Sequence, residues 1–277
     1  MSINTPGTSI GWPLRAWFGA ELFFAATASL SVGLRPADTA QNFAWTIKPE
    51  VMAALIGAFY LALAPVVILA LVAKRWESVR VFVLPGMVFT LAQLIVTFLH
   101  WDRFAVGTTP FNIWFVSYLL PPPVFLGCYL WQQRHAAQRG TAGFASSNPL
   151  VRWVRVGLFV LGAIFTLEAL AGLVYPAYFA SAPWKITPLN ARALSGYLLL
   201  LGLLMLSSAR ENDRDRVRIV SPFFVFFPPF AVLQVARFAD QVDTSHPRLY
   251  VATAALAAVW VLGAALIGGS WRKTLGR

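Results

Sequence analysis

The sequence predicts an all-α, polytopic membrane protein with eight transmembrane helices, built as two parallel four-helix repeats. Three observations lead to this fold class. Of the 277 residues, 58% are hydrophobic and 12% are charged, whereas soluble domains contain about 45–50% and about 25%. Eight runs stay apolar over about 20 residues, the length of a helix that crosses a bilayer. A short tryptophan- and proline-containing motif also occurs once in each half of the chain.

The composition excludes several other classes of protein. So few charged residues cannot cover the surface of a soluble globule of this length, which excludes a soluble enzyme. A chain this apolar is not disordered, because disorder accompanies low hydrophobicity. The single cysteine, Cys128, rules out a disulfide scaffold. A polytopic membrane protein is the class that remains.

The eight predicted spans follow one another through short connections. Each is apolar for about twice the roughly ten-residue length of a membrane-barrel strand, so helices are predicted. The first span is interpreted as a retained helix and not as a signal peptide, because no basic segment precedes Arg15. The spans are Leu14–Leu34, Val51–Ala73, Val79–Leu99, Asn112–Trp131, Trp153–Val174, Ala191–Ser208, Arg218–Phe238 and Pro247–Ser270.

Prolines mark the starts and the interruptions of several spans. Pro49 and Pro188 stand just before the second and sixth spans, where the first helical turn does not need the missing N–H. Pro121–Pro123 interrupts the fourth span near its centre and Pro228–Pro229 interrupts the seventh, since each proline removes a helix hydrogen bond. Such breaks accompany substrate sites in transporters, but they are equally packing devices.

The Lys and Arg residues predict the orientation of the bundle. They favour the cytoplasmic side in short loops, and 15 of the 22 fall on one side. We therefore expect that side, with both termini, in the cytoplasm. The net charge of +11 largely reflects this bias. The 15 are Arg15, Lys74, Arg75, Arg80, Arg134, Arg139, Arg152, Arg155, Arg210, Arg214, Arg216, Arg218, Arg272, Lys273 and Arg277, and the others are Arg35, Lys48, Arg103, Lys185, Arg192, Arg237 and Arg248.

A sequence repeat divides the chain into two four-helix units. The segment Trp45–Pro49 resembles Trp184–Pro188, and identities continue into the span that follows each of them. Further along, Val79–Val81 resembles Val217–Ile219. Because four is an even number, both units have the same topology and are related by a pseudo-two-fold axis along the membrane normal. We expect the units at residues 1–140 and 141–277.

Two glutamates inside the spans are candidate substrate- or ion-binding residues, because ionisable groups within a membrane are costly and commonly functional. Glu168 lies toward the outer end of the fifth span, and a hydrogen-bonded packing role is its alternative. Glu21 lies about two turns from the inner end of the first span. It could instead form an ion pair with Arg15 or Arg155 at the inner leaflet.

A third group of candidates lies at the outer ends of two spans. His100, Asp102 and Arg103 follow the third span, while Arg237 and Asp240 lie at the end of the seventh. The repeat places these two segments at matching positions, so Asp and Arg side chains could pair across the pseudo-axis. Such a group could bind a cation or a polar ligand, or it could pin two helices together.

No cofactor or metal site is predicted. A bis-His haem needs two histidines that face each other at one depth, whereas His100 and His246 lie outside and His135 lies inside. The spacing of the His and Asp residues follows no metal-site rule. The scattered basic residues also do not suggest nucleic acid. The expected partner is the bilayer, with anionic lipids at the basic inner face, and a second copy or another membrane protein is a further possibility.

Three functions remain open at this point. The duplicated bundle, the broken helices and Glu168 favour the binding or transport of a small solute or ion. The absence of known catalytic motifs and the short loops suit a non-catalytic accessory, sensor or scaffold subunit. The third function is an intramembrane enzyme that acts on a lipid-like substrate at the outer face. It requires His100, Asp102, Arg103 and Asp240 to converge on one cavity.

Overall fold

The computed structural model describes residues 8–268. Within them, eight helices or runs of helices are long and apolar enough to cross a membrane, and each coincides with one predicted span. The prediction of eight apolar helices is therefore confirmed. Ser270, at the end of the eighth predicted span, and the basic residues Arg272, Lys273 and Arg277 lie outside the described residues.

The first half of the chain contains four of these spans. The first span ends in a wider π-helical turn, and the second and third run through Pro65 and Pro85 without ending. Short helices fill the connections. The elements are α1 (Trp12–Ala28), η1 (Ser29–Leu34), η2 (Pro36–Asp38), α2 (Thr39–Asn42), α3 (Glu50–Val72), α4 (Trp76–Leu99), η3 (Trp101–Arg103), α5 (Thr109–Leu119) and α6 (Pro121–Gln138).

The break in the fourth span is confirmed. Helix α5 ends at Leu119, and α6 begins at Pro121 with the three consecutive prolines in its first turn. A proline fits the first turn of a helix, where its missing N–H has no intrahelical acceptor. Three prolines in a row therefore start a new helix more readily than they continue an old one.

The second half of the chain supplies the other four spans. Its second span begins with a capping bond, in which Thr187 accepts from the N–H of Asn190. A short helix and a tight turn lead directly into the third span. The elements are α7 (Arg152–Val174), η4 (Pro176–Phe179), α8 (Pro188–Glu211), α9 (Arg214–Val217), η5 (Arg218–Val220), α10 (Ser221–Arg237), η6 (Ala239–Gln241) and α11 (Pro247–Ile267).

The predicted interruption at Pro228–Pro229 is wrong. Helix α10 continues from Ser221 to Arg237 through both prolines. Two lost hydrogen bonds do not end the helix here, because α10 is packed along its length against α3 and α11. Tertiary packing of this kind outweighs a local preference.

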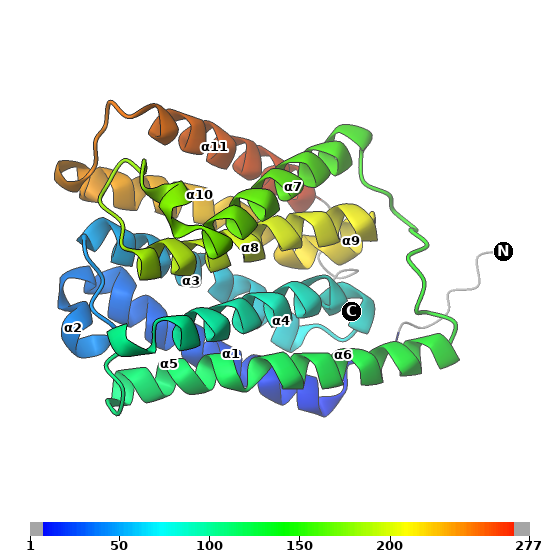
Figure 1. The fold of residues 1–277 in the computed structure, drawn as a ribbon. Coiled ribbons are helices and arrows are strands. Elements are labelled where there is room, and N and C mark those ends of the chain that lie inside the picture. The colour runs from blue at the N-terminus through cyan, green and yellow to red at the C-terminus, as the bar shows by residue number, and fades with distance from the viewer. Residues whose placement is uncertain (1–7, 269–277) are drawn as a thin grey trace.

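The helices form three layers in Figure 1. Helices α7, α10 and α11 lie on one side, α1, α5 and α6 lie on the other, and α3, α4 and α8 run between them. The central helices are more than half buried, whereas α1, α7, α11 and the fourth span are buried over about a quarter of their residues. The outer helices thus keep wide apolar faces for lipid.

The same kinds of helix pair occur in both halves of the chain. Helix α1 packs on α3, and α7 packs on α8. Helix α4 packs on α6, and α10 packs on α11. Contacts of α3 with α10, and of α4 with α8, join the first half to the second.

A buried ion pair also joins the halves, at the end of the bundle where α1, α4, α7 and α9 begin. We call this end the basic end. Arg80 of α4 donates to both carboxylate oxygens of Glu211, the last residue of α8, at 2.9 and 2.6 Å. Their side chains are 3% and 2% exposed, and Arg216 donates to the same carboxylate at 2.8 Å. Because buried charges are stable only when paired, this cluster fixes α4 against α8.

Candidate functional site

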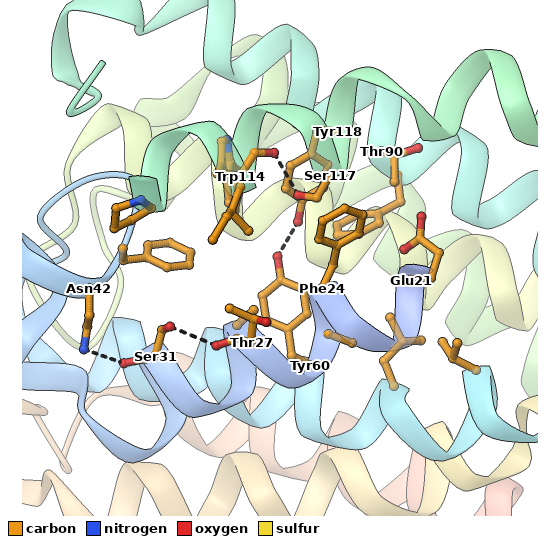
Figure 2. Close-up of a pocket in the computed structure, with 18 of the residues that line it drawn as sticks. Glu21, Phe24, Thr27, Ser31, Asn42, Tyr60, Thr90, Trp114, Ser117 and Tyr118 are labelled. Carbon is orange, nitrogen blue, oxygen red and sulfur yellow. Dashed lines mark hydrogen bonds between the residues drawn. The ribbon is translucent and has the colours of Figure 1, made fainter. Parts of the chain in front are cut away.

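A cavity of about 270 Å³ lies between α1 and α5, which we call the α1–α5 cavity (Figure 2). The two helices pack mainly on α3 and α4 and hardly on each other, which leaves space between them. The lining combines aromatic rings with carboxyl, amide and hydroxyl groups. The aromatic residues are Phe24, Phe43, Tyr60, Phe89, Trp114 and Tyr118, and the polar ones are Glu21, Thr27, Ser31, Asn42, Thr90, Thr109 and Ser117.

Glu21 lies in the third turn of α1, and Figure 2 shows its carboxylate at one end of the cavity. Its Oε1 atom is buried and has no hydrogen-bond partner among residues 8–268. The expected ion pair with Arg15 or Arg155 is wrong. Arg15 donates to the carbonyls of Leu71 and Ala73 at 2.8 and 2.7 Å, and Arg155 donates to that of Ala209 at 3.1 Å. Both arginines satisfy helix ends, so neither is a counter-charge for this carboxylate.

Four hydroxyl groups of the lining donate their protons to the backbone. A Ser or Thr hydroxyl has one proton and two lone pairs, so each of these groups keeps acceptor capacity for a ligand. The bonds run from Thr27 to Phe23 (2.9 Å), Ser31 to Thr27 (2.8 Å), Thr90 to Gly86 (2.9 Å) and Ser117 to Trp114 (2.8 Å).

Asn42 adds another acceptor at the opposite end of the cavity from Glu21 (Figure 2). Its Nδ2 donates to the carbonyl of Ser31 at 3.2 Å, while its Oδ1 is buried and has no partner within the described chain. The indole N–H of Trp114 is also engaged, since it donates to Thr97 Oγ1 at 2.9 Å. The polar lining of the α1–α5 cavity therefore consists largely of acceptors.

Three buried tyrosines form the wall between this cavity and a second one. Tyr60 of α3 is hydrogen-bonded to Tyr118 of α5, and Tyr197 of α8 donates to Tyr60 at 2.9 Å. Tyr60 and Tyr118 line the α1–α5 cavity, whereas Tyr197 lines a cavity between α7 and α11. A hydroxyl in an apolar interior is stable only when bonded, and the chain of bonds meets this requirement.

The second cavity, which we call the α7–α11 cavity, has a volume of about 460 Å³. Its walls also include residues of α3, α8, α10 and the connection around η4. Glu168 of α7 lies in its lining, and the described residues offer this carboxylate no hydrogen bond or ion pair. Glu21 and Glu168 thus stand in two different cavities, each on the first helix of its own half of the chain.

His100, at the end of α4, contacts the second half of the chain. Its Nε2 accepts from Arg192 Nη1 of α8 at 3.0 Å, and Arg192 Nε donates to the carbonyl of Leu173 at 2.9 Å. Partial burial, followed by the positive charge of Arg192, lowers the pKa of His100 below its usual value. The neutral ring therefore joins α4 to α8 as an acceptor, and Arg192 in turn joins α8 to α7.

The remaining members of the group at the ends of α4 and α10 do not come together. Asp102 pairs with its neighbour Arg103 at 3.0 Å, and both side chains are more than 70% exposed. Arg237 donates to the carbonyl of Gly33 at 3.4 Å, and no hydrogen bond or ion pair joins it or Asp240 to the other three among residues 8–268. The expected Asp–Arg pairing across the two halves is thus replaced by a pair within one turn. No group of three His, Cys, Asp or Glu side chains in the described chain could hold a metal ion.

Sequence reasoning missed Asn42 and the three tyrosines. Tyr60, Tyr118 and Tyr197 all lie inside apolar spans, where a hydroxyl must find a partner. That requirement is the signal by which the sequence could have marked them as candidates. Asn42 gave no comparable signal, because it lies in a connection between two spans.

No known protein family, no curated protein and no solved structure matches this chain. Its class therefore follows from its own fold. The eight apolar helices among residues 8–268 make it an integral membrane protein with multiple spans. Two cavities, each with one glutamate, lie among these helices.

Proposed function

We propose that this membrane protein binds a small cationic solute or ion in the α1–α5 cavity and carries it across the membrane through a duplicated helical bundle. One observation carries the proposal. The carboxylate of Glu21 lines the cavity, and one of its oxygens is buried without a partner. An ionised carboxylate within a membrane is stable only when it is paired. A cation in the cavity supplies the missing partner.

The rest of the lining suits the same class of solute. Asn42 Oδ1 and the hydroxyls of Thr27, Ser31 and Ser117 offer acceptors to a ligand that carries N–H donors or is itself an ion. The surrounding aromatic faces attract cations by about 0.5–2 kcal/mol per contact, more when water is excluded. An anion would meet neither a basic side chain nor a row of donors in this lining.

Two equivalent arginines support the duplication. Arg80 and Arg218 occupy matching positions in the repeated segments Val79–Val81 and Val217–Ile219, and both side chains are buried. Arg80 donates to the carbonyls of Ala142 and Gly143 at 3.0 and 2.9 Å, beyond the end of α6. Arg218 donates to those of Leu266 and Gly268 at the end of α11. Arg218 thus reaches the end of the fourth span of its own half, whereas Arg80 reaches the segment that follows the fourth span of the first half.

The positions of the cavities support the same division into units at residues 1–140 and 141–277. One cavity lies between the first and fourth spans of the first half, and the other lies between the corresponding spans of the second. When Pro36 is matched to Pro176, Glu168 falls on Ala28, seven residues after Glu21. Seven residues are nearly two helical turns, so both glutamates lie on the same face of equivalent helices.

The basic end is proposed to face the cytoplasm, with both chain termini on that side. Replacing Cys128 with Ser removes the single cysteine of the chain, so single cysteines can then be introduced at Gln138 and Thr244. Both positions are exposed, at opposite ends of the bundle. A membrane-impermeant maleimide added to intact cells should label Cys at position 244 and not at position 138. The reverse pattern would invert the proposed orientation.

Transport is tested with purified protein in liposomes, by measuring currents and uptake for Na⁺, K⁺, methylammonium and choline beside neutral and anionic solutes. We expect flux of at least one cation, and we expect Glu21→Gln to reduce it to background. Asp38→Asn, which neutralises an exposed acid in η2, is the matched control and should retain the flux. Background flux for every solute, or full flux in Glu21→Gln, would overturn the proposal.

A further inference from the structure

The α7–α11 cavity is wedge-shaped because its two helices touch at one end of the bundle and separate toward the other. Near the basic end, Gly157 of α7 lies against Leu262 of α11, so close that a Cβ atom on Gly157 would stand 2.9 Å from the leucine. The cavity-lining residues of these helices lie farther along, from Ile164 in α7 and up to Leu256 in α11. Figure 1 shows the same divergence of α7 and α11.

The inside of this wedge is apolar and aromatic. Phe59 of α3, Phe165 of α7 and Phe227 of α10 line its walls. Aliphatic side chains fill most of the remaining surface. A volume of about 460 Å³ falls in the usual range for sites that hold ligands of drug size. The lining therefore fits a chain or ring of hydrocarbon better than a small polar solute.

Two polar groups without partners stand in this apolar lining. Nε1 of Trp184 is buried and has no hydrogen-bond acceptor within residues 8–268. Glu168 has neither a hydrogen bond nor an ion pair there. Arg248, which also lines the cavity, donates to the carbonyl of Tyr178 at 3.0 Å and covers the ring of that residue, which belongs to the same lining. The Trp184 indole N–H and the Glu168 carboxylate thus have no partner in the described chain and remain for a ligand.

The rim of the cavity consists of exposed apolar side chains. Ile164 of α7, Val232 of α10 and Val251 of α11 are 46%, 45% and 68% exposed. Aliphatic side chains on the outside of a membrane protein face lipid tails. A ligand can therefore enter sideways from the bilayer, without passing through water.

The position of Glu168 along α7 indicates where the polar end of such a ligand would lie. Glu168 lies six residues before the end of α7 at Val174, which is about 9 Å along a helix. Trp184 lies in the connection beyond that end. A polar head would thus sit near the end of the bundle opposite the basic end, with its tail pointing toward the rings at the middle of the membrane.

We propose that the α7–α11 cavity is a second binding site, separate from the α1–α5 cavity, for a long-chain amino alcohol taken up from the lipid bilayer. The protonated amine of the ligand pairs with the Glu168 carboxylate. A hydroxyl oxygen of the head accepts from the Trp184 indole N–H. The hydrocarbon chain lies along Phe59, Phe165 and Phe227, where it replaces contacts with lipid tails.

The test uses the full-length protein in lipid nanodiscs and sphinganine that carries a diazirine in its tail. After illumination, mass spectrometry should find the label in the segments 164–184 and 249–256. Unmodified sphinganine should compete, whereas palmitic acid should compete at least about tenfold less well. Glu168→Gln should lower labelling by about tenfold, the effect of losing one charged hydrogen bond. Asp38→Asn, which neutralises an exposed acid outside both cavities, is the matched control and should label normally.

Two further variants keep the test decisive if Glu168→Gln folds poorly. Trp184→Phe removes the indole N–H while keeping an aromatic ring, although a smaller one, and Ala252→Phe fills the cavity from an exposed position of α11. Both should lower specific labelling, with an unchanged elution volume in size-exclusion chromatography. Labelling spread over all outer helices, equal competition by palmitic acid, or unchanged labelling in the folded variants would overturn the proposal. None of these results depends on whether the α1–α5 cavity transports cations.

Discussion

The hydroxyl of Tyr197 donates a hydrogen bond of 2.9 Å to the hydroxyl of Tyr60, and this bond joins the walls of the two cavities. Tyr60 belongs to the first half of the chain and Tyr197 to the second, and both side chains are buried. Tyr60 is bonded in turn to Tyr118. A ligand that displaces any of these rings in one cavity therefore also changes the wall of the other.

Removing this link should weaken the contact between the halves. We expect Tyr197→Phe to lower the free energy of unfolding by about 1 kcal/mol, because it deletes one buried hydrogen bond while the ring stays packed. Thermal unfolding in detergent micelles measures the change. Tyr250→Phe is the matched control, since Tyr250 is exposed and should unfold like the wild type. Equal stability of both variants would show that the bond contributes little.

The buried ion pair at the basic end should matter far more than an exposed one. Glu211→Gln leaves the Arg80 guanidinium buried beside a neutral group, and breaking a buried pair in this way costs about 3–5 kcal/mol. The double variant Arg80→Met, Glu211→Met should regain part of that loss, because no buried charge is left unpaired. Denaturant titration in micelles would measure both.

The exposed Asp102–Arg103 pair provides the control for this comparison. Asp102→Asn removes a pair whose side chains are more than 70% exposed, and pairs of this kind contribute little because water screens them. Its unfolding should match the wild type. A loss in Asp102→Asn as large as that in Glu211→Gln would contradict the role assigned to burial.

Length and hydropathy were enough to predict the spans, because a bilayer requires about 20 apolar residues from every crossing helix. The triple proline before Val124 correctly marked the interruption of the fourth span. Pro228–Pro229 did not end one, since packing on α3 and α11 is a tertiary effect that local sequence does not contain. The same limit applies to the glutamates. The sequence shows that both glutamates lie inside spans. It does not show whether Arg15 pairs with Glu21, because Arg15 instead donates to carbonyls at the end of α3, a contact that depends on tertiary packing.

Close packing of α3 against the end of the first span should be sensitive to a single methyl group. A Cβ atom on Gly57 would overlap the backbone of Gly33 in η1. We expect Gly57→Ala to destabilise the protein by about 1–3 kcal/mol, as overpacked positions do. Gly19→Ala is the matched control because a Cβ there meets no atom within 4 Å, and it should be neutral or stabilising. Unfolding of both variants in micelles distinguishes a backbone contact from a general effect of glycine.

Stability should fall on mild acidification through His100. Its pKa is lowered in the folded protein by burial and by the charge of Arg192, whereas an unfolded histidine titrates at about 6.5. Below that pH the unfolded chain takes up a proton more readily than the folded one. The contribution of this residue is therefore complete above about pH 6.5 and declines as the pH falls toward the lower folded value. A protonated ring would also lose its bond from Arg192 and face that cation at close range.

Replacing His100 isolates the contribution of this histidine to the pH dependence of stability. His100→Gln keeps an acceptor for Arg192 but cannot titrate, so the melting temperature of the variant should fall less between pH 7 and pH 5 than that of the wild type. His135→Gln changes a histidine of α6 whose ring bonds to and packs on Trp131 of the same helix; it is the matched control and should retain the full decline. An identical decline in wild type and His100→Gln would mean that other groups set the acid sensitivity. In that case the bond between α4 and α8 would not depend on the neutral ring.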